Sequence, residues 1–240
     1  MSINKRSVLI VGKSASGKSA SLRNLKKPEG VLFLNCDAGK DLPMPAKFGM
    51  LTVIDPYQVW DAFDRAEGSK KIHTIVIDTV TFMMAMFESV HVLEATNTMK
   101  AWGEYAQFFK KLMLNKVAAS TKNVIMLAHT MDILNEGEGV METLVKVKGS
   151  LMNEGIEAYF PVVVACKKMQ VQKLDAYKNK HLNITPEENA VGFKYVFQTN
   201  LTKETVNDRI RSPMGLWSVK ESFIDNDAQF LIDQLDAYYK

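Results

Sequence analysis

The segment from Gly12 to Ser19 has the residue types and the spacing of a phosphate-binding loop. It reads GKSASGKS after the apolar run at residues 8–11, which matches the pattern GxxxxGK[ST] between a strand and a helix start near Lys18. Glycines let backbone N–H groups turn toward phosphate oxygens, and a helix N-terminus adds partial positive charge. We expect Lys18 to reach the β and γ phosphates and Ser19 to bind Mg²⁺. The expected nucleotide contacts are Gly12, Lys13, Ser14, Ala15, Ser16, Gly17, Lys18, Ser19 and Ala20.

Two acidic residues end apolar runs and have the chemistry to complete a hydrolytic site. The run HTIVIDT places Asp78 at the end of a buried strand, where its carboxylate can hold Mg²⁺ through water opposite Ser19. Thr79 follows it, so the common adjacent Asp-Glu pair is missing. Asp37 ends a second run, VLFLNCD, and is our candidate for orienting the attacking water, although it also suits an ordinary turn before Ala38.

Two further positions could respond to a γ-phosphate. The run NVIMLAHT ends in His129 and Thr130, either of which could sense the phosphate and relay its loss to the next loop; a structural histidine is the alternative. Near the C-terminus, NDRIRSPMG carries Arg209 and Arg211. Arginine neutralises transition-state charge, often from a neighbouring subunit, so we choose Arg209 first and Arg211 second.

Short apolar runs predict the strands that position these side chains. The runs lie at residues 8–11, 31–34, 51–54, 75–77, 124–127 and 162–165, and they do not alternate with polar residues. Such runs are typical of strands buried on both faces of a mostly parallel sheet. Helical patterns lie at residues 57–66, 80–94, 101–117 and 227–239. The alternation of strands and helices predicts a doubly wound α/β domain.

Two segments depart from this alternation. Residues 131–155 are charged and punctuated by glycines, so we expect a long surface loop or a mobile flap. Residues 167–199 alternate at both ends, which predicts an antiparallel β extension of the sheet. No repeat or proline-rich linker divides the chain, so we expect one domain over residues 1–240.

Composition narrows the class of protein. The net charge is +3, so a nucleic-acid surface would have to be a local patch. Cys36 and Cys166 lack metal-ligand spacing, which argues against a zinc site or a disulfide framework. No run approaches the roughly 20 apolar residues of a membrane span, and no signal-peptide core is present. We therefore expect a cytoplasmic protein without a membrane partner.

Taken together, these motifs resemble the RecA-like P-loop ATPase core. More closely, the chain resembles the phage-encoded RecA-like ATPases of the single-strand-annealing and recombination group. The stretches that carry the resemblance are GKSASGKS, VLFLNCDAGKDLP, HTIVIDT, KAWGEYAQFFKKLM, NVIMLAHT, VKGSLMNEGIEAYF and NDRIRSPMG. In two places the chain departs from related ATPases: Asp37 stands where the water-orienting acid is usually Glu, and Asn207 stands where a Lys often precedes the arginine by two positions.

The resemblance implies ATP and Mg²⁺ as ligands, and slow or DNA-stimulated hydrolysis. It also implies binding to single-stranded DNA and pairing of complementary strands beside a single-strand-binding protein. A homo-oligomer, either a ring or a filament, would place ATP at subunit boundaries. If the protein is phage-encoded, it would work in the cytoplasm of a bacterial host.

Basic residues in the two departing segments are the expected DNA contacts. Lysine supplies charge for the phosphate backbone, and aromatic rings stack on bases. For any single lysine, a solvated surface position is the ordinary alternative. The expected contacts are Lys146, Lys148, Lys167, Lys168, Lys173 and Tyr177.

Three other functions are compatible with a phosphate-binding loop. A nucleotide-gated scaffold would bind DNA or a replication protein with little hydrolysis, and the shorter Asp37 keeps that reading open. A small-molecule kinase would need arginines in a lid, but residues 131–155 contain none. A GTPase would need Asn-Lys-x-Asp, and the nearest match, at Asn115, lacks the acid.

Overall fold

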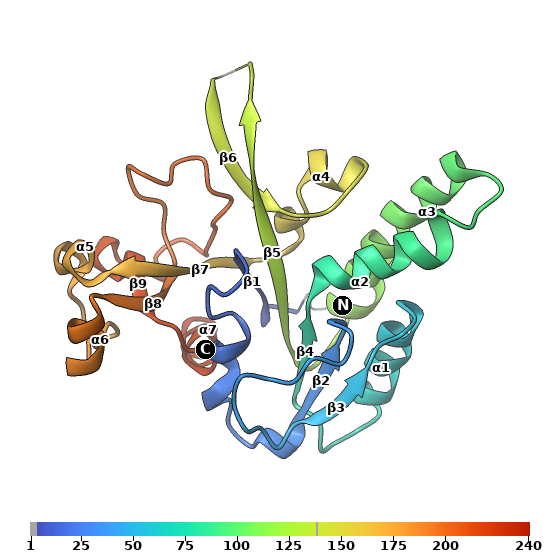
Figure 1. Cartoon of the computed structure of the whole chain (residues 1–240). Helices are drawn as coiled ribbons and strands as arrows, with labels where there is room; N and C mark the ends of the chain where they lie inside the picture. Colours follow the sequence, from blue (N-terminus) through green and yellow to red (C-terminus); the bar gives the residue numbers. More distant parts are fainter. Residues whose placement is uncertain (1–3, 138) are drawn as a thin grey trace.

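The computed structural model of this chain describes residues 4–137 and 139–240, and its strands form one nine-stranded sheet (Figure 1). The order is β3-β2-β4-β5-β1-β7-β8-β9, with β6 paired to β5 outside that path. The strands are β1 (Ser7–Gly12), β2 (Val31–Asn35), β3 (Gly49–Thr52), β4 (Thr74–Asp78), β5 (Asn123–Asn135), β6 (Val140–Val145), β7 (Val162–Gln170), β8 (Phe193–Gln198) and β9 (Phe223–Asp225). Pairs from β3 to β7 along the path are parallel, whereas β7–β8, β8–β9 and β5–β6 are antiparallel. The predicted α/β fold, a mostly parallel sheet with an antiparallel extension, is confirmed.

Helices cover both faces of the sheet. The α-helices are α1 (Tyr57–Glu67), α2 (Val80–Phe87), α3 (Thr98–Lys111), α4 (Ser150–Glu154), α5 (Val171–Leu174), α6 (Pro186–Val191) and α7 (Ala228–Tyr238). The 3₁₀-helices are η1 (Ser19–Asn24), η2 (Pro28–Gly30), η5 (Ile156–Tyr159), η6 (Asp175–Tyr177) and η7 (Val219–Ser222), and η3 (Glu88–Val92) and η4 (Leu112–Val117) are π-helical. Figure 1 shows α1, α2 and α3 on one side of the sheet and α7 on the other.

Each central strand contributes to two hydrophobic cores. In β1, Leu9 and Val11 pack into the core that includes α1, α2 and α3, whereas Val8 and Ile10 pack into the core that includes η1 and α7. Successive side chains of a strand point to opposite faces, so a strand covered on both faces must be apolar throughout. This is why the strands read as continuous apolar runs in the sequence.

The helix predicted near Lys18 is shorter and tighter than an α-helix. The N–H of Ser21 is shared between the carbonyls of Gly17 and Lys18, and the Ser21 hydroxyl also donates to the Lys18 carbonyl at 2.6 Å. Serine side chains compete for backbone groups in this way and tighten a turn. Leu25, with a ψ of 123°, ends this segment, and Pro28 begins the separate 3₁₀-helix η2. The loop is therefore followed by the six-residue 3₁₀-helix η1 and not by an α-helix.

The expectation of a surface loop or mobile flap over residues 131–155 is wrong. Strand β5 continues beyond the parallel sheet and turns back as β6, with Met131 opposite Leu144 and Ile133 opposite Glu142. Figure 1 shows this hairpin projecting from the body. Gly139 takes a positive φ of 67° at the turn, so glycine in this segment marks a hairpin turn, not an irregular loop.

The extension predicted over residues 167–199 is confirmed at its ends. Strands β7 and β8 pair antiparallel, with Lys168 opposite Tyr195. Between them the chain forms α5, η6 and α6, so the middle of the segment is helical and not strand. Thr185 caps α6 together with Glu188 in a capping box, which begins the helix at Pro186.

Candidate nucleotide site

The phosphate-binding loop turns sharply between β1 and η1, and close packing requires glycine at two positions. A Cβ on Gly12 would come within 2.6 Å of the Cys166 carbonyl, and Gly17 has a φ of +96°. A larger residue would clash at the first position and be strained at the second. The Cys166 thiol, in turn, donates to the Ser16 carbonyl at 2.9 Å, which ties the loop to β7.

Lys18 is buried inside this loop. Its Nζ donates to the carbonyls of Gly12 and Lys13, both at 2.9 Å. Burial lowers the pKa of Lys18, while the negative charge of Asp78 opposes that shift. The ammonium group is thus held by neutral carbonyls that a phosphate, as a stronger acceptor, can replace.

Ser19 and Asp78 lie in contact at the end of β4. The Ser19 hydroxyl donates to Oδ2 of Asp78 at 2.7 Å, and burial raises the pKa of this carboxyl. Hydroxyl and carboxylate oxygens are the ligands that Mg²⁺ prefers. These two residues, which the sequence predicts as the metal pair, are brought together and fit that ion.

Asp37 lies in the loop after β2, where Asn35 shapes the backbone. The Asn35 side chain accepts from the N–H of Asp37 at 3.0 Å and donates to the Lys40 carbonyl at 2.9 Å. Ala38 and Gly39 have positive φ values of 51° and 77° in the same turn. Lys40 brings its Nζ to 3.9 Å from the Asp37 carboxylate.

His129 is half-buried beside Lys18, where the parallel part of β5 ends. Its Nδ1 lies 3.3 Å from the Lys18 Nζ, and its backbone N–H donates to the Thr81 hydroxyl at 2.9 Å. Burial, reinforced by the Lys18 charge, lowers the pKa of His129 to about 4. The imidazole is therefore neutral at physiological pH and can accept a hydrogen bond from Lys18.

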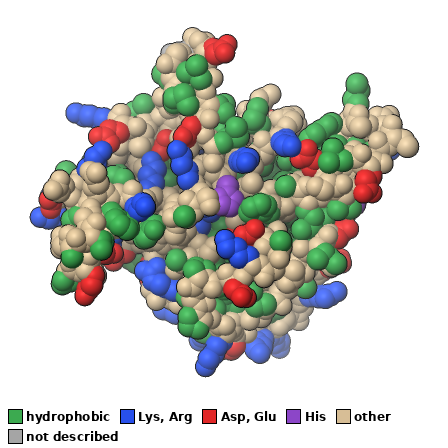
Figure 2. Space-filling view, in the orientation of Figure 1, with side chains coloured by type: hydrophobic (Ala, Val, Ile, Leu, Met, Phe, Trp, Pro, Cys, Tyr) green, Lys and Arg blue, Asp and Glu red, His purple; other side chains and the backbone are tan. Residues whose placement is uncertain are grey.

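These residues surround a cavity of about 990 Å³. It lies at the carboxyl edge of the parallel strands, where α/β proteins bind ligands. Figure 2 shows Lys and Arg side chains gathered around a His side chain on this face. The lining includes Ser14, Ala15, Ser16, Gly17, Lys18, Ser19, Ala20, Asp37, Asp78, His129, Thr130 and Lys146.

Lys13 differs from the other predicted nucleotide contacts. Its ammonium group pairs with Asp132 of the hairpin at 2.6 Å, and Thr143 donates to the same carboxylate at 2.9 Å. The hydrogen bond from Lys13 lowers the pKa of Asp132. The Lys13 side chain thus links the loop to the hairpin, while its backbone carbonyl holds Lys18.

Arg209 lies outside the nucleotide cavity of its own chain. Its guanidinium is 3.5 Å from Glu142 on the hairpin and 3.7 Å from Glu157, whose other oxygen accepts from the N–H of Val145 at 2.6 Å. Glu157 is 4% exposed. Arg209 therefore balances a buried carboxylate, and a second cavity of about 280 Å³ borders it.

The fold places the predicted DNA contacts in different surroundings. Lys146 lines the nucleotide cavity, whereas Lys148 pairs with Glu88 at 2.8 Å and Lys167 pairs with Asp208 at 2.6 Å. Lys168 and Tyr177 each pack against an aromatic ring, of Phe193 and Phe223 respectively, and Lys173 is exposed on α5.

The cavity wall also includes residues that were not predicted from the sequence, among them Arg23, Asn35, Lys40, Tyr195 and Asn226. Asn35 and Lys40 lie in the stretch VLFLNCDAGKDLP, whereas Tyr195 and Asn226 are brought to the loop by the antiparallel strands. For Asn35 and Lys40, the sequence signal that could have placed them at the cavity is that they lie only two and three positions from Asp37.

A family model described as an AAA domain matches residues 4–192. No curated protein matches the chain. Within residues 4–137 and 139–240, no helix combines the length and apolar character needed to cross a membrane. The match covers the phosphate-binding loop, both acidic strand ends and the parallel sheet that presents them, and the chain accordingly belongs to the AAA domain family of P-loop NTPases, which are ATP-binding nucleotide hydrolases.

Proposed function

We propose that this protein binds ATP and Mg²⁺ at the cavity, hydrolyses ATP slowly or in response to single-stranded DNA, and uses the nucleotide to control its grip on that DNA. In this proposal it is a DNA recombination protein of the phage RecA-like group. It assembles as a homo-oligomer, a ring or a filament, beside a single-strand-binding protein in a bacterial cytoplasm. It promotes annealing or pairing of complementary strands.

The observation that carries the proposal is the continuity of β5. The strand passes His129, which touches Lys18, and then continues into the projecting hairpin. Lys146 directly follows β6, the return strand of this hairpin. Its N–H donates to the His129 carbonyl at 2.8 Å, and its side chain lines the cavity. Nucleotide bound at the phosphate-binding loop and DNA bound on the hairpin would therefore both act on Lys18, His129 and Lys146.

Hydrolysis would use Asp37 to orient water and Lys18 with Mg²⁺ to stabilise charge on the transferring phosphate. Arg209 would serve a neighbouring subunit, for which it must leave Glu142 and Glu157. The alternative is a nucleotide-gated scaffold with little turnover. The Asp37 carboxylate favours it in one respect, because it has the shorter acidic side chain and already faces Lys40 at 3.9 Å.

The test is fluorescence anisotropy of a labelled single-stranded oligonucleotide with and without ATP and Mg²⁺, over a salt series. We expect tighter binding with nucleotide. Lys146→Ala should reduce the slope of log K against log salt by about 1. Lys70→Ala, in the turn between α1 and β4 at the opposite edge of the sheet, is the matched control and should leave the slope unchanged.

Absence of DNA binding at low salt in either nucleotide condition would refute the DNA part of the proposal. ATPase assays with and without the oligonucleotide separate the two alternatives. Turnover that rises with DNA supports the recombination ATPase, whereas nucleotide-dependent DNA binding without turnover supports the scaffold.

A further inference from the structure

The nucleotide cavity has two chemically different ends. Lys18, Ser19 and Asp78 form one end, where the β and γ phosphates and the metal belong. The other end lies beyond Ala20, where Arg23 on η1 faces residues that follow β7 in the chain. The lining there, which includes Lys194, Tyr195 and Asn226, is available to the nucleoside of a triphosphate bound by its terminal phosphates.

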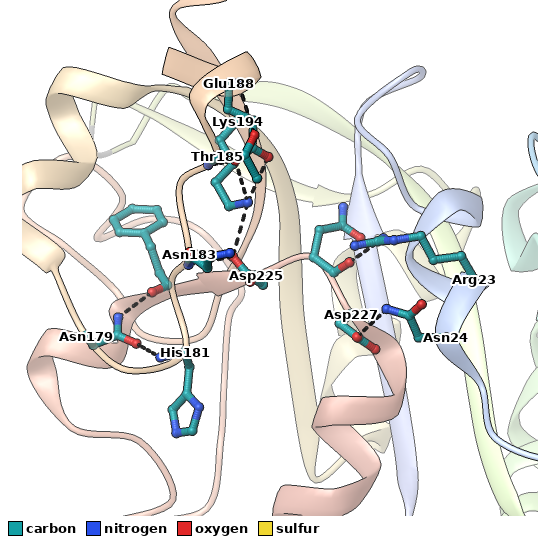
Figure 3. Close-up of polar contacts among 12 residues, drawn as sticks. Arg23, Asn24, Asn179, His181, Asn183, Thr185, Glu188, Lys194, Asp225 and Asp227 are labelled. Atoms are coloured by element: carbon teal, nitrogen blue, oxygen red, sulfur yellow. Dashed lines mark hydrogen bonds and ion pairs between the residues drawn. The ribbon is translucent and has the colours of Figure 1, made fainter.

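The cations at the second end are engaged by other groups. Lys194 on β8 lies between Glu188, at 2.8 Å, and Asp225, at 3.2 Å (Figure 3). Nη1 of Arg23 donates to the carbonyls of Ala20, at 3.0 Å, and Asn226, at 2.7 Å. Because the Lys194 charge is neutralised by two carboxylates, the part of the wall that β8 forms suits an uncharged aromatic group better than a phosphate.

Tyr195 offers an aromatic face on this wall. Its ring carbons lie 3.1 and 3.4 Å from the point where a Cβ on Gly17 would stand, so the ring sits directly against the phosphate-binding loop. The side chain is 38% exposed and is supported by the edge of Phe193, with ring centroids 5.8 Å apart. An aromatic ring that lines a cavity with part of its surface free is a stacking platform.

Asn226 presents a buried acceptor without a donor. Its Nδ2 donates to the Gly17 carbonyl at 3.2 Å and to the Cys166 sulfur at 2.9 Å, and the residue is 4% exposed. Oδ1 is buried and has no hydrogen-bond partner among residues 4–137 and 139–240. Buried acceptors are normally paired, and Asn226 lines the cavity, so a ligand that brings a hydroxyl or an amine would satisfy it.

We infer that Tyr195 and Asn226 form the nucleoside subsite of this cavity. The base stacks on the Tyr195 ring, and Oδ1 of Asn226 accepts a hydrogen bond from the ribose or from the base amine. The inference rests on the proposed binding of ATP through its phosphates. It gives the antiparallel extension a role in nucleotide recognition, because Tyr195 lies on β8 and Asn226 directly follows β9.

Isothermal titration of ATP·Mg²⁺ and of inorganic tripolyphosphate with Mg²⁺ tests the subsite. Tyr195→Ala should weaken ATP binding roughly 5- to 150-fold, the range of base–aromatic stacking, and leave tripolyphosphate binding within about twofold. Tyr195→Phe keeps the ring and should bind ATP like the wild type. Tyr238→Ala, on α7 outside the cavity lining, is the matched control and should change neither ligand.

The outcomes separate this inference from the proposed function. Unchanged ATP binding by Tyr195→Ala, or equal affinity of the wild type for ATP and tripolyphosphate, would overturn the subsite while leaving phosphate binding intact. Failure of the wild type to bind either ligand would overturn both. For Asn226, 2′,3′-dideoxy-ATP lacks the ribose hydroxyls and purine riboside triphosphate lacks the base amine, so weaker binding of one of them identifies the donor. If the protein binds both analogues as tightly as ATP, Asn226 is not part of the subsite.

Discussion

The Nζ of Lys18 lies 3.3 Å from Nδ1 of His129, so the phosphate-binding loop contacts the strand that continues into the hairpin. An ammonium group can only donate, so His129 accepts at Nδ1 and carries its proton on Nε2. Phosphate bound at the loop competes for the same ammonium group. We therefore expect bound nucleotide to alter the surroundings of β5 at this contact.

Truncation of the two lysines of the loop should affect ATP binding to very different extents. Lys18→Ala is expected to weaken ATP·Mg²⁺ binding about 10- to 100-fold, because a buried ammonium group forms charge-assisted hydrogen bonds with phosphate. Lys13→Ala should change it less than about threefold, since that side chain forms an exposed ion pair with Asp132. Titration of a fluorescent ATP analogue measures both. Equal losses would show that Lys13 also reaches the phosphates.

Asp37 should affect turnover and not affinity. Asp37→Ala is expected to lower kcat about 100- to 10,000-fold and keep the Kd for ATP within about threefold, because a residue that orients water acts in the transition state. Steady-state ATPase assays and equilibrium binding measure the two quantities, with Asp61→Ala on α1 as the acidic control. Normal hydrolysis by Asp37→Ala would make our assignment of the water-orienting role wrong.

Arg209 should contribute to folding within its own subunit. Arg209→Ala leaves the buried Glu157 carboxylate without its cation, at a cost of about 1–2 kcal/mol after allowance for the partial exposure of Arg209 and the contact of 3.7 Å. Tm should fall by roughly 2–8 °C. Adding Glu157→Gln removes the unpaired charge and should restore most of the loss. If the double variant is no more stable than Arg209→Ala, the pairing of Arg209 with Glu157 does not account for the loss of stability.

The role of Arg209 in a neighbouring subunit needs a separate measurement. Neither Lys18→Ala nor Arg209→Ala subunits should hydrolyse ATP alone, because each lacks one half of a shared site. Mixing them should recover part of the activity, since some interfaces then combine an intact P-loop with an intact arginine. A mixture that stays inactive at every ratio would argue against action in trans, and Arg211→Ala would then be mixed in the same way.

Acid should destabilise the protein through His129. Its folded pKa of about 4 lies below the ordinary value of 6.5, so the unfolded chain binds more protons between these two values. The free energy of unfolding therefore falls as the pH drops from 6.5 toward 4, by about 1 kcal/mol at pH 5 after allowance for solvent screening of a half-exposed group. Thermal unfolding of His129→Asn should show a smaller decrease in Tm between pH 7 and pH 5. Parallel pH profiles for the two proteins would contradict this.

Local spacing and the pattern of apolar runs were enough to predict a phosphate-binding loop and the α/β fold. Gly12, Lys18 and Ser19 lie within one short segment, so their spacing along the chain is nearly their spacing in space. Asp78 could be predicted because a parallel strand buried on both faces is apolar throughout and its first polar residue marks the carboxyl edge. The same logic placed Asp37 and His129 at that edge.

The side chains that the predicted residues contact could not be predicted from the sequence, because they come together through tertiary packing. Asn226 contacts Gly17 across 209 positions, and Lys13 contacts Asp132 across 119, so no local pattern signals either pair. Arg209 contacts Glu142 on the hairpin and Glu157, which is bonded to the end of the hairpin at Val145. The sequence did not predict this hairpin, because its glycines and charges are typical of loops. A polar side chain takes the partner that packing brings to it, and packing is a property of the whole chain.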